Sequence, residues 1–156
     1  MRLHLISIGN KMPHWVGEGY LEYAKRLPNE CALNLVEIAP GHRGKSADIH
    51  RAVREEGGRM LAAIPKGALV VVLDVIGKPW STGQLSAHLG DWMRSGRDVA
   101  LLVGGPEGLC DRCLAVADLR WSLSAMTFPH PLVRVILAEQ IYRAWSLLRN
   151  HPYHRA

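Results

Sequence analysis

Two neighbouring segments near the end of the chain hold residue types that could do chemistry. The first, residues 123–144, reads LSAMTFPHPLVRVILAEQIYRA, in which a loop of serines, a threonine and a histidine precedes a long apolar helix. Pro129 and Pro131 restrict the backbone on both sides of His130, so this loop is expected to be a preformed wall. Its backbone amides and carbonyls suit the edge of a flat heterocycle such as adenine. A phosphate is less suited, because Pro131 at the helix start has no N–H to donate.

The second segment is the tail NHPYHRA, which closes the chain. Pro152 is expected to end the helix and direct the tail outward. Tyr153, His154 and Arg155 then offer a hydroxyl, a proton acceptor and a cation. In a single chain such a tail is usually a frayed terminus, whereas in a dimer it can cross to the partner's site.

The loop PGHRGKS, residues 40–46, resembles the end of a phosphate-binding P-loop. That motif needs a first glycine at residue 39, where this chain has Ala39, so a nucleoside triphosphatase is disfavoured. We interpret the segment as a basic loop whose Arg43 and Lys45 contact phosphates or only solvent.

The turn VGGPEG, residues 103–108, resembles a dinucleotide fingerprint but has Pro106 where that pattern needs glycine. Its glycines still allow a ligand to approach the backbone closely. The alternative interpretation is a tight turn between a strand and a helix.

Cysteine usage favours a reduced chain, and therefore a cytoplasmic location. The three cysteines are Cys31, Cys110 and Cys113, and the last two form a C-x-x-C without a second such pair. A structural zinc site needs about four ligands, so no metal is expected. We interpret the pair as two small helical residues on one face.

The overall composition predicts one globular domain with an anionic partner. The chain has 156 residues, of which 48% are hydrophobic, and a formal net charge of +5. A basic protein of this size often binds nucleic acid. The longest apolar run has the length of a strand, so no membrane span is expected, and the first residues do not resemble a signal peptide.

The chemical segments must be positioned by strands and helices that alternate along the chain. Strands are expected at 2–8, 32–38, 68–74, 98–105 and 119–124, and helices at 15–27, 47–64, from Ser81, at 109–117 and at 132–150. This pattern predicts an α/β fold, a mostly parallel sheet flanked by helices. Ligands of such sheets lie beyond the carboxyl ends of the strands, here in the loops after Leu73, Val103 and Ser122.

The last helix is apolar over most of its circumference, and its polar residues are Glu139, Arg143, Ser146 and Asn150. Two faces are therefore expected to be buried, one on the sheet and the other on a second subunit of a homodimer. The alternative is a helix buried twice within one chain.

Three motifs, VGGPEG, SLSAMTFPHPLVRVILAEQIYRA and NHPYHR, closely resemble one family in order and spacing. That family is the bacterial large-subunit ribosomal RNA pseudouridine N3-methyltransferases of the SPOUT superfamily. The resemblance covers residues 1–156 and implies a single SPOUT methyltransferase domain with a C-terminal trefoil knot. It also implies S-adenosyl-L-methionine as cofactor, a homodimer with a shared site, and a pseudouridine in the assembled ribosome as substrate.

The resemblance further implies roles for individual residues. Tyr153 would stack on or hydrogen-bond the target base, and His154 is a candidate acceptor of its proton. Arg155 would hold a phosphate or stabilise the developing anion, and Arg143 is a further candidate for that stabilisation. RNA contacts would come from Lys11, Trp15, Arg43 and Lys45. Cofactor contacts fall on Leu73, Gly104, Leu123, Ser124, Ala125, Met126, Thr127 and Phe128. The rivals are an RNA-binding protein without catalysis and a methyltransferase of another nucleoside.

Overall fold

The computed structural model describes residues 1–44 and 48–155 and shows strands and helices that alternate as expected. The strands are β1 (Arg2–Ile8), β2 (Ala32–Ile38), β3 (Leu69–Pro79), β4 (Val99–Val103) and β5 (Leu119–Ser122). The α-helices are α1 (His14–Ala24), α2 (Ile49–Ala63), α3 (Thr82–Ser95), α4 (Asp111–Ala115) and α5 (His130–Leu148). Two 3₁₀ helices, η1 (Asn29–Cys31) and η2 (Pro152–Arg155), complete the described secondary structure.

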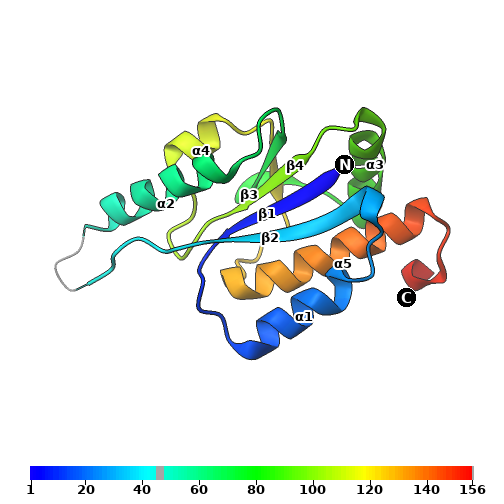
Figure 1. The fold of residues 1–156 in the computed structure, drawn as a ribbon, viewed down its shortest axis with the longest axis horizontal. Coiled ribbons are helices and arrows are strands. Elements are labelled where there is room, and N and C mark those ends of the chain that lie inside the picture. The colour runs from blue at the N-terminus through cyan, green and yellow to red at the C-terminus, as the bar shows by residue number, and fades with distance from the viewer. Residues whose placement is uncertain (45–47, 156) are drawn as a thin grey trace.

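The five strands form one sheet in the order β2-β1-β4-β3-β5, and every neighbouring pair is parallel. Helices α2 and α4 cover one face, while α1, α3 and α5 cover the other (Figure 1). The predicted α/β fold with a parallel sheet is therefore confirmed. All carboxyl strand ends lie at one edge of the sheet, which is where ligands of such folds bind.

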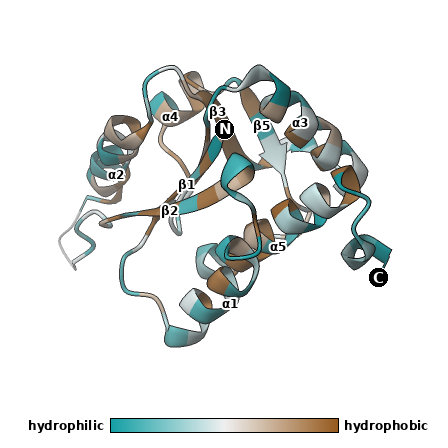
Figure 2. Cartoon of the chain, turned by 45° about the vertical axis from the view of Figure 1, so that its right-hand side comes forward, coloured by the Kyte–Doolittle hydropathy of each residue, from teal (hydrophilic) through white to brown (hydrophobic). Residues whose placement is uncertain are grey.

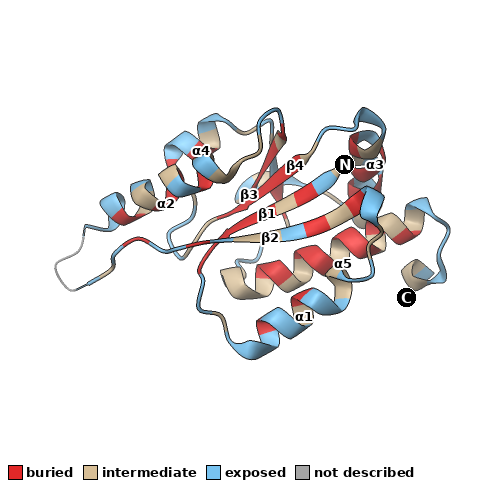
Figure 3. Ribbon diagram, viewed as in Figure 1, coloured by how far each residue is buried: buried red, intermediate tan, exposed pale blue. Residues whose placement is uncertain are grey.

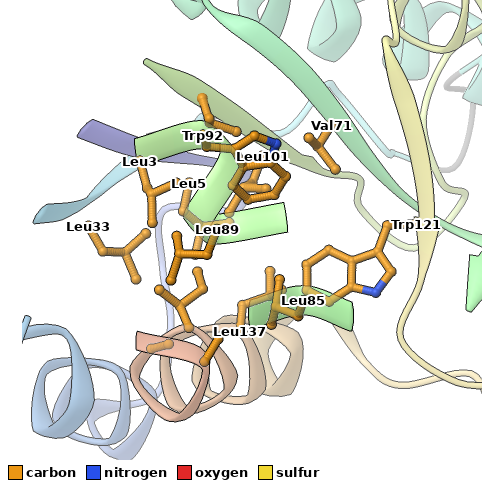
Figure 4. Packing of buried hydrophobic residues seen from close by; sticks show 14 of the residues in the cluster. Leu3, Leu5, Leu33, Val71, Leu85, Leu89, Trp92, Leu101, Trp121 and Leu137 are labelled. Carbon is orange, nitrogen blue, oxygen red and sulfur yellow. The ribbon is translucent and has the colours of Figure 1, made fainter. Parts of the chain in front are cut away.

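Apolar strands account for the core. All five residues of β4 are buried, and the central strands are apolar on both faces, as expected for a sheet with helices on both sides (Figures 2 and 3). The side of the sheet that carries α3 and α5 packs leucines of the strands against Leu85, Leu89 and Leu137 of those helices (Figure 4). Ser81 caps α3 as expected, since its hydroxyl accepts from the Gln84 amide.

Strand β3 is longer than the sequence suggests. It was expected to end at residue 74, but it continues to Pro79 through an irregularity at which Leu73 and Lys78 both pair with Trp121. Gly77 permits this, because a β-carbon there would lie 2.8 Å from the carbonyl carbon of Arg120. The inserted residues bulge beyond the sheet edge, and Ile76 is exposed.

Helix α5 is buried mostly within its own chain. It packs on β1 and lies between α1 and α3, which cover its two flanks (Figure 1). Because three helices share one face of the sheet, the chain itself supplies cover that the sequence argument assigned to a second subunit, and the homodimer stays a prediction. Leu148 and the half-buried Leu132 and Ile136 are among the apolar residues of α5 that this packing leaves partly accessible.

Helix α5 begins at the edge where the strands end and runs back toward their starts, so the C-terminus lies at the opposite edge (Figure 1). The tail does not point outward as expected. Asn150 has a φ of 57°, and the His151 amide donates to the carbonyl oxygen of Ser146 at 2.8 Å. The reversed chain then forms η2, which packs against α5. Within the described residues, no helix is both long and apolar enough to cross a membrane.

Candidate functional site

The three strand ends identified from the sequence meet at one cavity of about 840 Å³. Its walls are residues 73–76 of β3, residues 103–109 after β4, and the loop after β5 into the start of α5. Cavities of a few hundred to about a thousand cubic ångströms accommodate small ligands and cofactors. The three loops that the strand-end rule selected from the sequence therefore line one cavity, and its use as a binding site stays a prediction.

Seven of the eight residues expected to contact a cofactor line this cavity. They are Leu73, Gly104, Leu123, Ser124, Met126, Thr127 and Phe128. The eighth, Ala125, is exposed and is not part of the lining. Prolines 129 and 131 and His130 contribute to the wall as well.

The loop after β5 holds its shape through its own polar groups. The Ser122 hydroxyl donates to the carbonyl oxygen of Ser124 at 3.0 Å, and the Ser124 hydroxyl accepts from the Met126 amide at 3.0 Å. Leu123 and Phe128 pack against the core and anchor the loop at both ends. The wall of the cavity is thus held by contacts within the chain.

The turn at residues 103–108, here called the glycine turn, needs glycine because of its backbone geometry. A β-carbon on Gly104 would lie 2.5 Å from the carbonyl carbon of Gly108, and the Gly108 amide donates to Gly105 at 3.0 Å. Gly108 itself has a φ of +80°, a conformation that favours glycine. Gly104 therefore serves the closure of the turn, and a larger residue there would distort the turn instead of filling the cavity.

A smaller cavity of about 420 Å³ adjoins the first and shares Leu123, Ser124 and Phe128 with it. It extends along α5 to Gln140, whose side-chain carbonyl accepts from the Thr82 hydroxyl at 2.8 Å. The Gln140 amide in turn donates to Glu139 at 2.8 Å. Polar groups of α5 thus connect the cavity region with the residues near the tail.

Arg134 was missed by sequence reasoning, although it lies directly behind the cavity wall. Only 1% of it is exposed, and its guanidinium donates to the Glu37 carboxyl at 2.8 Å and to the Gly9 carbonyl at 2.6 Å. Longer contacts reach the Ser7 hydroxyl and the Ile8 carbonyl. Arg134 therefore ties the first turn of α5 to the ends of β1 and β2.

His130 lies between this arginine and the cavity. Burial lowers the pKa of His130 below its ordinary value, and the nearby cations Arg134 and Arg43 lower it further, while Glu56 opposes them. The imidazole is therefore neutral at physiological pH.

The residues expected to contact RNA have different environments. Lys11 and Trp15 are exposed, and 53% of Trp15 is accessible. The Arg43 guanidinium is held by Glu56 and Glu107, so it is not a free phosphate contact in this structure. Lys45 lies outside the described residues.

The residues expected to be catalytic gather around the middle of α5. Glu139 accepts from Arg143 Nε at 2.8 Å and from the Tyr153 hydroxyl at 3.0 Å, and the Arg143 guanidinium lies 4.9 Å from the centre of the Tyr153 ring. Burial and the hydrogen bond to Glu139 raise the pKa of Tyr153 to about 12. At neutral pH Tyr153 is therefore a hydrogen-bond donor and not a base.

The other tail residues flank this cluster. Nδ1 of His154 is buried and has no hydrogen-bond partner in the described part of the chain. Arg155 is exposed. Glu139 stands nine residues after His130, which corresponds to about 14 Å along the helix. Within one chain, the tail therefore does not reach the large cavity.

The C-x-x-C pair is packed in the core. Cys110 and Cys113 are both buried, with 3.6 Å between their sulfur atoms, and burial raises the pKa of Cys113 to about 12. A β-carbon on Gly57 of α2 would overlap the Cys110 sulfur, which explains a glycine in the middle of that helix. Residues 1–44 and 48–155 contain no cluster of three potential metal ligands.

Comparisons with known proteins find relatives over nearly the whole chain. Ribosomal RNA large subunit methyltransferase H of Thioalkalivibrio sulfidiphilus (strain HL-EbGR7) is 67% identical over 155 residues, which is 99% of each chain. The protein of the same name from Methylococcus capsulatus is 63% identical over 99% of this chain and 100% of its own length.

Two solved structures share the fold. A probable methyltransferase from Bordetella pertussis Tohama I has a TM-score of 0.55 at 14% identity and covers 91% of this chain and 95% of its own. The putative methyltransferase Lpg2936 from Legionella pneumophila, solved with the bound cofactor SAM, has a TM-score of 0.50 at 10% identity, over 92% and 66% of the two chains. The family model described as "Predicted SPOUT methyltransferase" matches residues 1–154. The chain belongs to the SPOUT methyltransferase family.

Proposed function

We propose that this protein methylates N3 of a pseudouridine in large-subunit ribosomal RNA, with S-adenosyl-L-methionine as the methyl donor. The observation that carries the proposal is the preformed cavity at three strand ends of a chain that belongs to the SPOUT methyltransferases. Relatives named as ribosomal RNA methyltransferases support the substrate class.

The residues around the cavity fit such a donor. Its lining is mainly apolar, with backbone amides and carbonyls from the loop after β5 and from the glycine turn, which suit an adenine edge. The structure of the Legionella pneumophila methyltransferase with bound SAM supports the choice of donor. Leu123 and Phe128 would form the apolar walls, and the loop backbone from 124 to 127 would supply the polar edge.

When bound, S-adenosylmethionine supplies an electrophilic methyl group on a sulfonium sulfur. N3 of pseudouridine must lose its proton before or during attack, so the chain has to accept that proton and stabilise the anionic base. His154, whose buried Nδ1 has no hydrogen-bond partner among the described residues, would accept the proton once that nitrogen is exposed to the base. Arg143 and Arg155 provide positive charge, and the protonated hydroxyl of Tyr153 can donate to a carbonyl of the base.

The two halves of the site belong to different subunits of a homodimer in this proposal. Methyl transfer needs an in-line approach over about 3 Å, and positioning is a large part of its barrier. The tail packs halfway along α5 of its own chain and does not line the cavity. A second copy can bring its tail to the cavity, with the partly accessible residues Leu132 and Ile136 in the contact.

The remaining features of the proposal follow from the resemblance of the sequence to the ribosomal RNA methyltransferases of the SPOUT superfamily. Residues 1–156 act as one SPOUT domain in the cytoplasm, on the assembled ribosome. The C-terminal part forms a trefoil knot. In support, β5 lies at the sheet edge beside β3, yet the helix that follows it returns to contact β1 and α1.

The proposal is tested with ribosomes from cells that lack the modification. We expect the protein and S-adenosylmethionine to add one methyl group to a pseudouridine of the large subunit, detected by mass spectrometry of nuclease fragments. Calorimetry should show binding of S-adenosylmethionine and S-adenosylhomocysteine but not ATP. RNA binding without cofactor binding would support the non-catalytic rival, and a methyl group on another nucleoside would support the rival methyltransferase.

A further inference from the structure

Arg43, in the loop between β2 and α2, connects two carboxyl groups from distant parts of the chain. Its Nη1 lies 2.5 Å from Oε2 of Glu56, and its Nη2 lies 2.7 Å from Oε2 of Glu107. Nε also donates to Glu107, at 3.2 Å, so the guanidinium binds that carboxyl with two nitrogens. This geometry uses the planar fork that distinguishes arginine from lysine.

The two carboxyl groups differ in their surroundings. Glu56 of α2 is only 2% exposed, and its Oε2 also accepts from the Gly41 amide at 3.0 Å. Its Oε1 has no partner among the described residues. Glu107 is exposed, belongs to the glycine turn after β4, and lines the large cavity. One guanidinium therefore joins a buried anchor to the cavity wall.

The loop that carries Arg43 packs closely against helix α2. A β-carbon on Gly41 would lie 2.6 Å from the Cα atom of Ala52, so the loop backbone lies directly against α2. A β-carbon on Gly105 would lie 3.6 Å from Nη2 of Arg43. The guanidinium thus lies over the glycine turn as well as beside its glutamate.

We propose that Arg43 is a positioning residue for the cofactor cavity, which it shapes by holding the turn 104–108 through Glu107 against the buried Glu56. Cofactor affinity and the conformation of the loop at residues 39–44 are thereby linked. The inference rests on the proposed function, because it takes the large cavity as the site of S-adenosylmethionine.

The physical reason is the balance of charge around the guanidinium. Without it, two carboxyl groups on either side of the same space lose their counter-charge and repel each other. Glu56 is fixed in a helix by its surroundings, so the exposed Glu107 moves away and displaces the turn. Because the turn is a wall of the cavity, the displacement lowers cofactor affinity.

The test compares Arg43→Met with Arg51→Met, which removes an exposed arginine of α2 whose one ion pair among the described residues is with Glu55. Calorimetry with S-adenosylhomocysteine should show about tenfold weaker binding for Arg43→Met, and native affinity for Arg51→Met. Arg43→Lys should lie between native and Arg43→Met, because an ammonium group cannot bind both carboxyls in the same way.

A double variant tests whether Arg43 acts on the cavity through Glu107. Arg43→Met combined with Glu107→Gln should bind S-adenosylhomocysteine no more weakly than Arg43→Met alone, since the second change removes the repulsion. Hydrogen exchange at residues 39–44 should slow when the ligand binds to the native protein, and much less in Glu107→Gln. A merely structural role would lower the unfolding temperature without either effect.

The outcomes separate this inference from the proposed function. If the native protein binds the ligand and folded Arg43→Met binds it within about twofold of native, Arg43 does not position the cavity. That result together with weaker ribosome binding would assign Arg43 to phosphate contacts and overturn the inference. If the native protein itself does not bind the ligand, the proposed function fails first.

Discussion

Arg134 shows how one residue can decide the geometry of a site that it does not line. A buried cation is costly unless its hydrogen-bond capacity is used, and this guanidinium has four acceptors at the ends of β1 and β2. By this contact it fixes the start of α5, and with it the wall formed by Pro129 and His130. The sequence gives no hint of this role, because the acceptors lie 97 to 127 residues away along the chain.

We expect Arg134→Met to lower the free energy of unfolding by about 3–5 kcal/mol, because the change leaves the buried oxygens of Ser7, Ile8 and Gly9 without this donor. Denaturant titration followed by circular dichroism measures this. Arg94→Met is the matched control, since Arg94 is exposed and, within residues 1–44 and 48–155, forms an ion pair with Asp91 of the same helix alone. That control should change stability by less than about 0.5 kcal/mol. A loss below about 1 kcal/mol for Arg134→Met would show that the network contributes little.

At the scale of elements, the parallel sheet explains why the cavity could be located from sequence. Apolar β-branched strands predicted the sheet, and the sheet predicted which loops meet a ligand. The direction of single loop residues could not be predicted, because it depends on hydrogen bonds such as that between the Ser124 hydroxyl and the Met126 amide. Ala125 and Thr127 are both exposed in the same loop, yet only Thr127 lines the cavity.

This difference gives a matched pair of variants. Thr127→Trp places an indole at the cavity and should abolish detectable binding of S-adenosylmethionine, while Ala125→Trp should leave affinity within about threefold of native. Both positions are exposed, so both variants are expected to fold. Calorimetry measures the affinities, and thermal unfolding checks the fold. Equal affinities for the two variants would contradict the assignment of the cavity as the donor site.

Two elements differ from expectation for reasons that only the tertiary structure contains. Strand β3 continues to Pro79 because β5 pairs with it on both sides of the irregularity. Helix α5 is covered on both flanks because α1 and α3 share its face of the sheet. A hydrophobic pattern shows that a helix is buried but not which neighbour covers it, so the sequence alone could not divide the cover of α5 between its own chain and a second subunit.

At the scale of the whole molecule, the cavity and the tail of one chain lie too far apart to form one site. The cavity lies at the carboxyl ends of the strands, and α5 runs away from it toward the C-terminus (Figure 1). Tyr153 packs on Glu139 and Arg143, where a base bound at the cavity of the same chain is out of reach. The central claim is therefore that each active site combines the cavity of one subunit with the tail of the other.

The most direct measurement is the methyltransferase activity of a mixed dimer on ribosomes. One subunit lacks the residues after Asn150, and the other carries Thr127→Trp; each has its own affinity tag, so that only mixed dimers are purified. Light scattering confirms the dimer, and both parent homodimers should be inactive. With shared sites, the mixed dimer joins an intact cavity to an intact tail once, and it should keep about half of the native activity. An inactive mixed dimer, or a native protein that remains a monomer while it methylates ribosomes, would contradict the shared site.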